Sequence, residues 1–163
     1  MKEQGSAVAT ASQTAGPFFH LGLKPQRGAT VAATGQARTR LLVTVTDGDG
    51  KPVDDALIEC WQKNSAHGAV FTRAATGPDG TCEIETSQAP HINVCVFARG
   101  LLRHLHTRIY FAGDAAIESD PVLALVPSER RQTLIARPDA AAAGRWRFDL
   151  RLQGEGETVF FDV

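Results

Sequence analysis

The chain has 163 residues, of which 43% are hydrophobic and 21% charged, and its formal net charge is −1 at pH 7. This composition is typical of one globular domain, large enough to bury about 70% of the surface of its extended chain. The balanced charge argues against nucleic-acid binding, which needs a clustered positive excess. No apolar run approaches about 18 residues, so we expect no membrane span.

The three cysteines indicate a reducing compartment. Cys60, Cys82 and Cys95 are widely spaced, and each lies inside a predicted strand. An odd number of cysteines without a close pair is typical of buried, reduced thiols. The first residues also lack the apolar core of a signal peptide. We therefore expect a cytoplasmic protein.

The chain is predicted to begin with an extended arm. Residues 1–13 are small and polar, without periodicity, and an apolar patch with a Gly-Pro step follows at 13–23. A Gly-Pro step cannot continue a helix, and two adjacent phenylalanines seldom stay in water. Residues 24–39 are again small and polar. We predict an N-terminal arm and loop over 1–39, lying against another surface.

Residues 40–163 carry the regular structure, which we predict to be one β-sandwich domain. Strands are predicted at 41–46, 53–61, 70–72, 81–86, 91–99, 104–111, 133–137, 145–152 and 158–163. Asp120 followed by Pro121 predicts a capped short helix over 121–126, and a single turn is expected at 128–131. About seven to nine short strands at this spacing predict an antiparallel β-sandwich with short helical turns.

The hairpin at 89–111 has one apolar face and one face rich in reactive groups. At a period of two, its apolar face carries Ile92, Val94, Val96 and Ala98, followed by Leu105, Thr107, Ile109 and Phe111. Its polar face carries His91, Asn93, Cys95, Phe97 and Arg99, and then His104, His106, Arg108 and Tyr110. The polar face is therefore an active site, part of one, or a solvated surface.

Two kinds of site are open on this polar face. His104 and His106 are two residues apart and share a face, the spacing that a metal ion favours, and His91 lies on the partner strand. Strand histidines are more often hydrogen-bonded or solvated, and no His-Glu-x-x-His pattern supports a metal. Arg99, at a strand end, is either a carboxylate-binding residue or a solvated arginine. No Gly-x-Ser-x-Gly motif supports a hydrolase nucleophile.

Six motifs in the same order carry a family resemblance. They are Gln-Thr-Ala-Gly-Pro at 13–17, Ala-Pro-His-Ile-Asn at 89–93, Phe-Ala-Arg-Gly at 97–100, His-Thr-Arg-Ile-Tyr-Phe at 106–111, Arg-Arg-Gln-Thr-Leu at 130–134 and Gln-Gly-Glu-Gly-Glu-Thr-Val-Phe-Phe-Asp at 153–162. As a set they resemble the α subunits of the protocatechuate 3,4-dioxygenase family of intradiol ring-cleaving enzymes. The resemblance runs from about residue 10 to the C-terminus. Segments 24–38 and 64–88 look shorter than is usual in the family.

The resemblance implies a mostly antiparallel β-sandwich and a division of labour between two chains. In the family, an α subunit pairs with a related β subunit that holds non-haem Fe(III) through two tyrosines and a His-x-His pair. This chain has one tyrosine, Tyr110, and Asn93 occupies the second position of the pair that His91 begins. An amide is a poor replacement for imidazole on iron. We therefore expect no metal ligand and no catalytic residue in this chain, with Fe(III) held by the partner β subunit.

The resemblance also places parts of this chain at the edge of the partner's pocket. Thr14, Gly16, Pro17 and Arg99 match residues that border the substrate in the family. A guanidinium suits the carboxylate of a dihydroxybenzoate, and a Gly-Pro edge leaves room beside a flat ring. His104 and His106 match no family ligand. The implied reaction is the cleavage of protocatechuate by O2 to 3-carboxy-cis,cis-muconate in an assembly of αβ pairs.

Three other functions stay open at this point. The chain is a diverged subunit that acts on another catechol, or a β-sandwich that serves only for binding or assembly. The third is a stand-alone metalloenzyme that uses His91, His104 and His106.

Overall fold

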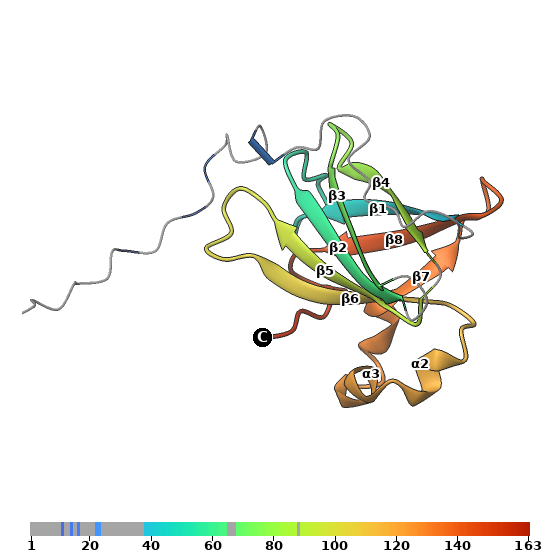
Figure 1. Ribbon diagram of the computed structural model, residues 1–163. Helices are drawn as coiled ribbons and strands as arrows, with labels where there is room; N and C mark the ends of the chain where they lie inside the picture. The colour runs from blue at the N-terminus through green and yellow to red at the C-terminus, as the bar shows by residue number, and fades with distance from the viewer. Residues whose placement is uncertain are drawn as a thin grey trace, which may run out of the picture.

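The computed structural model describes residues 38–64, 68–87 and 89–163, together with residues 11, 14, 16, 22 and 23 (Figure 1). Most of the predicted arm therefore lies outside the described residues, including Pro17 of the expected pocket edge. The described strands are β1 (Arg38–Thr46), β2 (Leu57–Asn64), β3 (Gly68–Ala75), β4 (Thr81–Ser87), β5 (Ile92–Phe97), β6 (Leu105–Phe111), β7 (Ile135–Pro138) and β8 (Arg145–Arg151). The short helices are α2 (Ala116–Ser119), α3 (Pro121–Leu125) and the 3-10 helix η1 (Arg131–Leu134).

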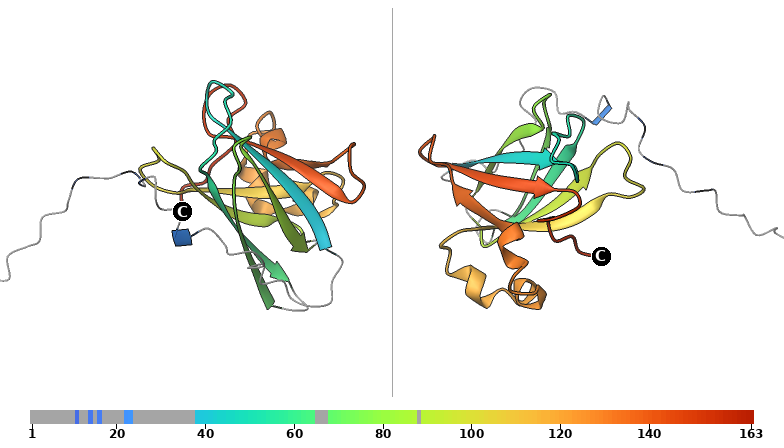
Figure 2. Two further views of the ribbon diagram at one scale, coloured as in Figure 1. Left: turned by 90° about the horizontal axis from the view of Figure 1, so that it is seen from above. Right: turned by 180° about the vertical axis from the view of Figure 1, so that it is seen from behind.

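The eight strands form one sheet that folds into two halves. The strand order is β3-β2-β5-β6-β7-β8-β1-β4, and a short parallel pairing of β6 with β7 joins the two halves. The edge strands β3 and β4 contact each other, so the sheet nearly closes into a barrel-like sandwich (Figure 2). Helices α2 and α3 lie at one end of the sandwich, beside β6 and β7 (Figure 1).

The predicted mostly β sandwich is confirmed and most strand pairings are antiparallel, but two pairings are parallel. Strands β1 and β8 pair in parallel from Arg40 opposite Arg145 to Thr46 opposite Arg151. Parallel strands need a long connection, and here most of the domain separates the two. The alternation of polar and apolar residues within either strand does not reveal such a pairing between the first and last strands.

The core is built from the apolar faces of the strands. Leu41, Val43 and Val45 of β1 are fully buried. The apolar face predicted for β5 is confirmed, since Ile92, Val94, Val96 and Ala98 are at most 1% exposed. Burying one large aliphatic side chain contributes about 1.5–3 kcal/mol relative to exposure. Burial of the apolar face therefore determines that the opposite, polar face of the hairpin points away from the core.

Two of the three cysteines are buried in this core. Burial raises the pKa of the Cys82 thiol to about 12, and it raises the pKa of Cys60 further. All three thiols are free, and Cys95 is half-buried on the outer face. Both core thiols therefore stay protonated and pack as small apolar groups.

No helix among the described residues is both long enough and apolar enough to cross a membrane.

Several element boundaries differ from the prediction, and long-range hydrogen bonds explain one of them. Strand β2 begins at Leu57, because Thr76 holds residues 53–56 as a loop. Residues 158–163 form no strand, and only one bridge joins Phe161 to His106 of β6. Strand β7 begins at Ile135, because η1 occupies the preceding residues.

Gly80 lies in the tight turn before β4 and fits only as glycine. Its φ is +71°, and a Cβ there would lie 2.7 Å from the Val45 carbonyl oxygen and 2.8 Å from the Cβ of Pro52. Gly50 has a similar φ of +79°, but a Cβ there would meet no atom within 4 Å. The two glycines therefore separate the cost of the backbone conformation from the cost of a steric clash.

We expect Gly80→Ala to lower the free energy of unfolding by about 2–4 kcal/mol, because strain and overpacking add at that position. Gly50→Ala should cost only about 1 kcal/mol, the price of a left-handed residue alone. Urea unfolding of both variants measures the difference. Equal losses in the two variants would contradict the close packing of Gly80 against β1.

Candidate functional site

The outer face of the β5–β6 hairpin carries the candidate site. The register places Asn93 opposite Arg108 and Cys95 opposite His106, so these four side chains share one face of the sheet. On the other side of β5, Trp61 of β2 lies opposite Asn93. The polar face predicted from the alternation is thus formed by three neighbouring strands.

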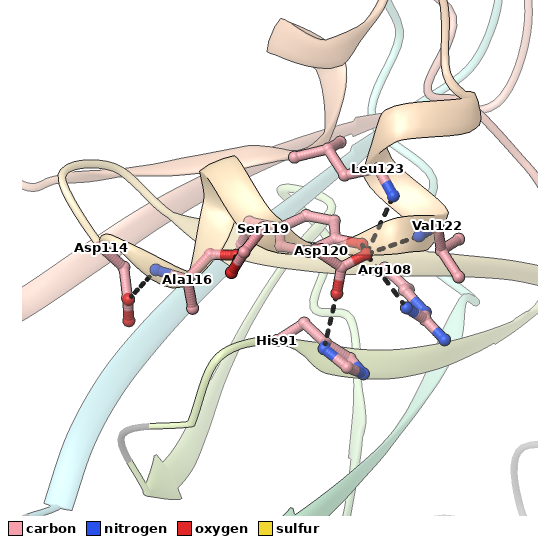
Figure 3. Close-up of polar contacts among 9 residues, drawn as sticks. His91, Arg108, Asp114, Ala116, Ser119, Asp120, Val122 and Leu123 are labelled. Atoms are coloured by element: carbon pink, nitrogen blue, oxygen red, sulfur yellow. Dashed lines mark hydrogen bonds and ion pairs between the residues drawn. The ribbon is translucent and has the colours of Figure 1, made fainter.

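Asp120 lies at the end of this face and caps α3, as predicted. Its Oδ1 accepts hydrogen bonds from the backbone N–H groups of Val122 and Leu123, both at 2.9 Å (Figure 3). Pro121 follows at the first helical position, where its missing N–H costs nothing. The cap fixes the carboxylate where the helix meets the sheet.

The same carboxylate contacts three side chains of the hairpin. The Tyr110 hydroxyl donates to Asp120 Oδ1 at 3.0 Å, and an Arg108 guanidinium nitrogen lies 3.5 Å from that oxygen. His91 Nδ1 lies 3.4 Å from the other oxygen, Oδ2 (Figure 3). The side chain of Asp120 is only 9% exposed, so these contacts are weakly screened by solvent. Sequence analysis identified the cap but missed this second role.

The surroundings set the pKa values of the cluster. Burial alone raises the pKa of Asp120, but hydrogen bonds from Leu123, Tyr110 and Val122 outweigh it and hold the pKa below its usual range. Burial lowers the pKa of His91, and Arg108 lowers it further, against an opposing effect of Asp120. Burial raises the pKa of Tyr110. At neutral pH the cluster therefore contains a carboxylate, a neutral imidazole and a neutral phenol.

His104 and His106 form a separate group with Cys95. The Cys95 sulfur lies 3.2 Å from His106 Nδ1, and the two imidazole rings are 4.6 Å apart in an edge-to-face contact. The ring of Phe97 packs 5.2 Å from that of His104. His91 lies instead against Asp120 and the Tyr110 ring, so it does not join the other two histidines in a ligand set.

The described residues do not fit the iron ligand set that the resemblance implies. Tyr110 is fully buried and donates its proton to Asp120, whereas an iron ligand would have to be a tyrosinate. Asn93 offers only an amide in the second histidine position. Within residues 38–64, 68–87 and 89–163, no three His, Cys, Asp or Glu side chains are grouped closely enough to hold a metal ion.

Arg99 lies in the turn after β5 and pairs with a residue that sequence analysis missed. Its Nε lies 3.1 Å from Asp55 Oδ2, and its side chain is 59% exposed. Thr14 and Gly16 are also exposed, and a Cβ on Gly16 would meet no atom within 4 Å.

Another concave surface lies between the short helices and β7. It encloses about 630 Å³ and is lined by Ile117, Leu123, Ile135, Arg131 and Arg137 among others. Both arginines are engaged, since Arg131 donates to the carbonyls of Val126 and Ala124 and Arg137 donates to Gln132. Short helices give little periodicity, so the sequence did not indicate this hollow.

Comparison with known proteins identifies the family. The chain is 41% identical to the protocatechuate 3,4-dioxygenase alpha chain of Burkholderia cepacia, covering 94% of this chain and 97% of that one. It is 38% identical to the alpha chain of Pseudomonas putida, covering 94% and 96%. The chain belongs to the family of protocatechuate 3,4-dioxygenase alpha chains. No family model matches the chain.

The chain is also similar to the other subunit type, and it shares its fold with dioxygenases of known structure. The Burkholderia cepacia beta chain is 28% identical, covering 73% of this chain and 66% of that one. The dioxygenase domain of a Streptomyces fusion protein shares the fold with a TM-score of 0.60 at 24% identity, covering 89% and 98%. Hydroxyquinol 1,2-dioxygenase of Pseudomonas putida gives a TM-score of 0.60 at 22% identity, covering 91% and 68%.

The chain is shorter than its alpha-chain relatives. The alignment with the Burkholderia chain spans 192 positions, whereas 94% of the present 163 residues is about 153. About 39 positions are therefore filled only in the relative. The expected shortening is confirmed in total length, while its location at 24–38 and 64–88 stays a prediction.

We expect the free energy of unfolding to fall as the pH drops below about 6.5, the usual pKa of histidine. His91 has a lowered pKa in the folded chain, so the unfolded state binds more protons between that pKa and about 6.5. The contribution of His91 to the free energy of unfolding is complete above this pH range, and it is lost as the pH falls through the range. Asp120, with its own lowered pKa, loses its contribution only in a more acidic window, below about 3.9.

Urea unfolding between about pH 5 and pH 8 measures this dependence. His91→Gln, which has no titrating ring, should flatten the slope without abolishing it. His106 also has a pKa lowered by burial and by His104, so it supplies part of the same slope. An identical slope in wild type and His91→Gln would contradict the burial of the neutral ring beside Asp120.

Proposed function

We propose that this chain is the α subunit of a protocatechuate 3,4-dioxygenase. With an iron-bearing β subunit, it would cleave protocatechuate with O2 to 3-carboxy-cis,cis-muconate. The observation that carries the proposal is the 41% identity to an alpha chain of that name over nearly the full length of both chains. Its free, buried thiols suit the reducing cytoplasm, where we place the enzyme.

We assign Fe(III) to the β subunit, because the donor set of this chain is unsuitable. Tyr110 is a buried phenol bonded to Asp120, and Asn93 replaces the second imidazole of the family's pair. An α subunit of this kind would contribute shape and charge, and the redox chemistry would be that of the partner's metal. This chain would then have no catalytic residue of its own.

We propose that Thr14, Gly16, Pro17 and Arg99 border the substrate in the assembled enzyme. The guanidinium of Arg99 is largely exposed and is available to a carboxylate brought by another chain. Thr14 and Gly16 are likewise exposed. A pocket at a subunit boundary would explain why a single chain leaves these residues without a common partner.

The outer face of β2 and β3 supports a protein partner. Trp61 is 47% exposed, and its ring packs 4.6 Å from that of Phe71. The Arg73 guanidinium lies over the Phe71 ring and also donates to the carbonyl of Leu23, at the end of the predicted arm. An exposed tryptophan is typical of interface hot spots, and Arg73, which also pairs with Glu59, holds the neighbouring Phe71 ring.

A subunit that acts on another catechol is the second candidate. The observation that favours it is the shortening by about 39 positions relative to the Burkholderia chain. Loops carry much of the specificity of a scaffold, so their loss is a plausible route to a new substrate. A pure assembly module is the third candidate, and it differs from the other two in forming no active complex.

We expect the purified chain to contain no stoichiometric iron and to lack the colour of a tyrosinate–iron centre. Co-expression with the adjacent reading frame should give a coloured complex that consumes O2 with protocatechuate. Iron analysis and an oxygen electrode measure both properties. A coloured and active preparation of this chain alone would overturn the subunit proposal, and an inactive, iron-free complex would favour the assembly module.

We expect Arg99→Ala in the complex to raise KM for protocatechuate about 10- to 150-fold. A lost charge-assisted hydrogen bond costs about 1.5–3 kcal/mol of binding free energy. Iron content should stay at the wild-type level, because Arg99 is not a metal ligand. Steady-state kinetics with parallel iron analysis test both statements, and an unchanged KM would remove Arg99 from the pocket.

A further inference from the structure

The strand register brings Asp55 to Arg99. Leu57 of β2 lies opposite Phe97 of β5 in an antiparallel ladder. Continuing that register by two residues, beyond the end of both strands, places Asp55 opposite Arg99. Because residues two apart share a face, the two charged side chains lie on the same side of the sheet. The observed distance of 3.1 Å between Asp55 Oδ2 and Arg99 Nε agrees with this placement.

The loop that carries Asp55 is anchored by a buried threonine. Thr76 is 6% exposed, and its hydroxyl donates to the Val53 carbonyl at 2.8 Å. The same hydroxyl accepts from the backbone N–H of Ala56 at 2.9 Å, and the Thr76 N–H donates to the Ala56 carbonyl at 2.9 Å. Hydrogen bonds on both sides of Asp55 therefore fix its backbone.

The carboxylate of Asp55 is placed to act on one group. Its side chain is 14% exposed, and Oδ2 is buried without an aligned hydrogen-bond donor in the described part of the chain. The positive charge of Arg99, 3.1 Å away, compensates this buried oxygen. A buried carboxylate oxygen needs such a partner, because desolvation without compensation is costly.

Arg99 is held at its base but open at its tip. The turn is closed by a hydrogen bond from Leu101 N–H to the Ala98 carbonyl at 3.3 Å, and Gly100 has a φ of +92°. Asp55 engages Nε, on the side of the guanidinium. The side chain is 59% exposed, and this contact at Nε is its only ion pair within the described part of the chain. A guanidinium binds a carboxylate in two-point fashion through one of its edges, so its outer edge remains available.

We propose that Asp55 is a positioning residue that orients Arg99 toward the carboxylate of the substrate. This rests on the proposed function, in which Arg99 borders the pocket of the partner subunit. Asp55 touches no substrate. It fixes the rotamer of Arg99 through Nε, so that the terminal nitrogens face the incoming carboxylate before binding. Pre-organisation of this kind saves the cost of ordering a long side chain at the moment of binding.

The test uses the co-expressed complex and the isosteric variant Asp55→Asn. We expect KM for protocatechuate to rise by about 10-fold, because Arg99 loses its orientation, with kcat within about twofold and iron content unchanged. KM for catechol, which has no carboxylate, should stay at the wild-type value. A merely structural role would shift KM for both substrates. Asp49→Asn is the matched control, because Asp49 forms an exposed ion pair with Lys51.

A double-mutant cycle with Arg99→Ala isolates the coupling. In the Arg99→Ala background, Asp55→Asn should cause no further rise in KM. If Arg99→Ala raises KM and Asp55→Asn leaves it unchanged, the positioning role is wrong and the proposed function stands. A lower KM in Asp55→Asn would show that Asp55 competes with the substrate for Arg99, and it would also overturn the proposal. If Arg99→Ala itself leaves KM unchanged, Arg99 does not border the pocket, and the positioning role of Asp55 is overturned with it.

Discussion

The carboxylate of Asp120 connects the helical end of the molecule to the outer face of the sheet. One oxygen caps α3 and accepts the Tyr110 proton, and the other faces His91. Removing this side chain would leave two backbone donors and a buried phenol without their acceptor, which is far more costly than losing a surface contact. The same carboxylate therefore determines both the position of α3 and the hydrogen bonding of the polar face.

This network bears on how a family of metal enzymes contains a chain that we propose to be metal-free. At the two positions that the resemblance aligns with a histidine pair, this chain has one imidazole near Asp120 and one amide. Its single tyrosine is protonated and buried. The Asp120 carboxylate is engaged within the chain by Tyr110, Arg108 and the α3 backbone, whereas His91 Nδ1 is buried without an aligned hydrogen-bond partner among the described residues. Such a face can be kept in a related subunit whose role is to support a partner.

The sequence predicts the parts of this structure that depend on local alternation. The apolar face of β5 and the Asp120 cap are recognisable because burial and capping act over a few residues. The parallel pairing of β1 with β8 is different, because it joins the two ends of the domain. The contact between Asp55 and Arg99 follows only from the register of β2 on β5. A pattern within one strand cannot specify either contact.

The family motifs and the chemistry of single residues pointed to different residues. Spacing alone left His104 and His106 as possible ligands, and the structure shows them engaged with each other and with Cys95. The resemblance singled out Arg99, but it gave no reason for an aspartate opposite it. That reason is physical, because an exposed arginine at a turn has many rotamers and needs a fixed counter-charge to select one.

The shortening of the chain does not interrupt the fold. The sheet is continuous from β3 to β4, and the match to the Streptomyces dioxygenase domain covers 98% of that domain. Arg99 and Asp55 lie in turns fixed directly by the β2–β5 ladder and by Thr76. A charged pair anchored in this way does not depend on long loops, so under the proposed function recognition of a carboxylate would persist while the rest of the pocket changes.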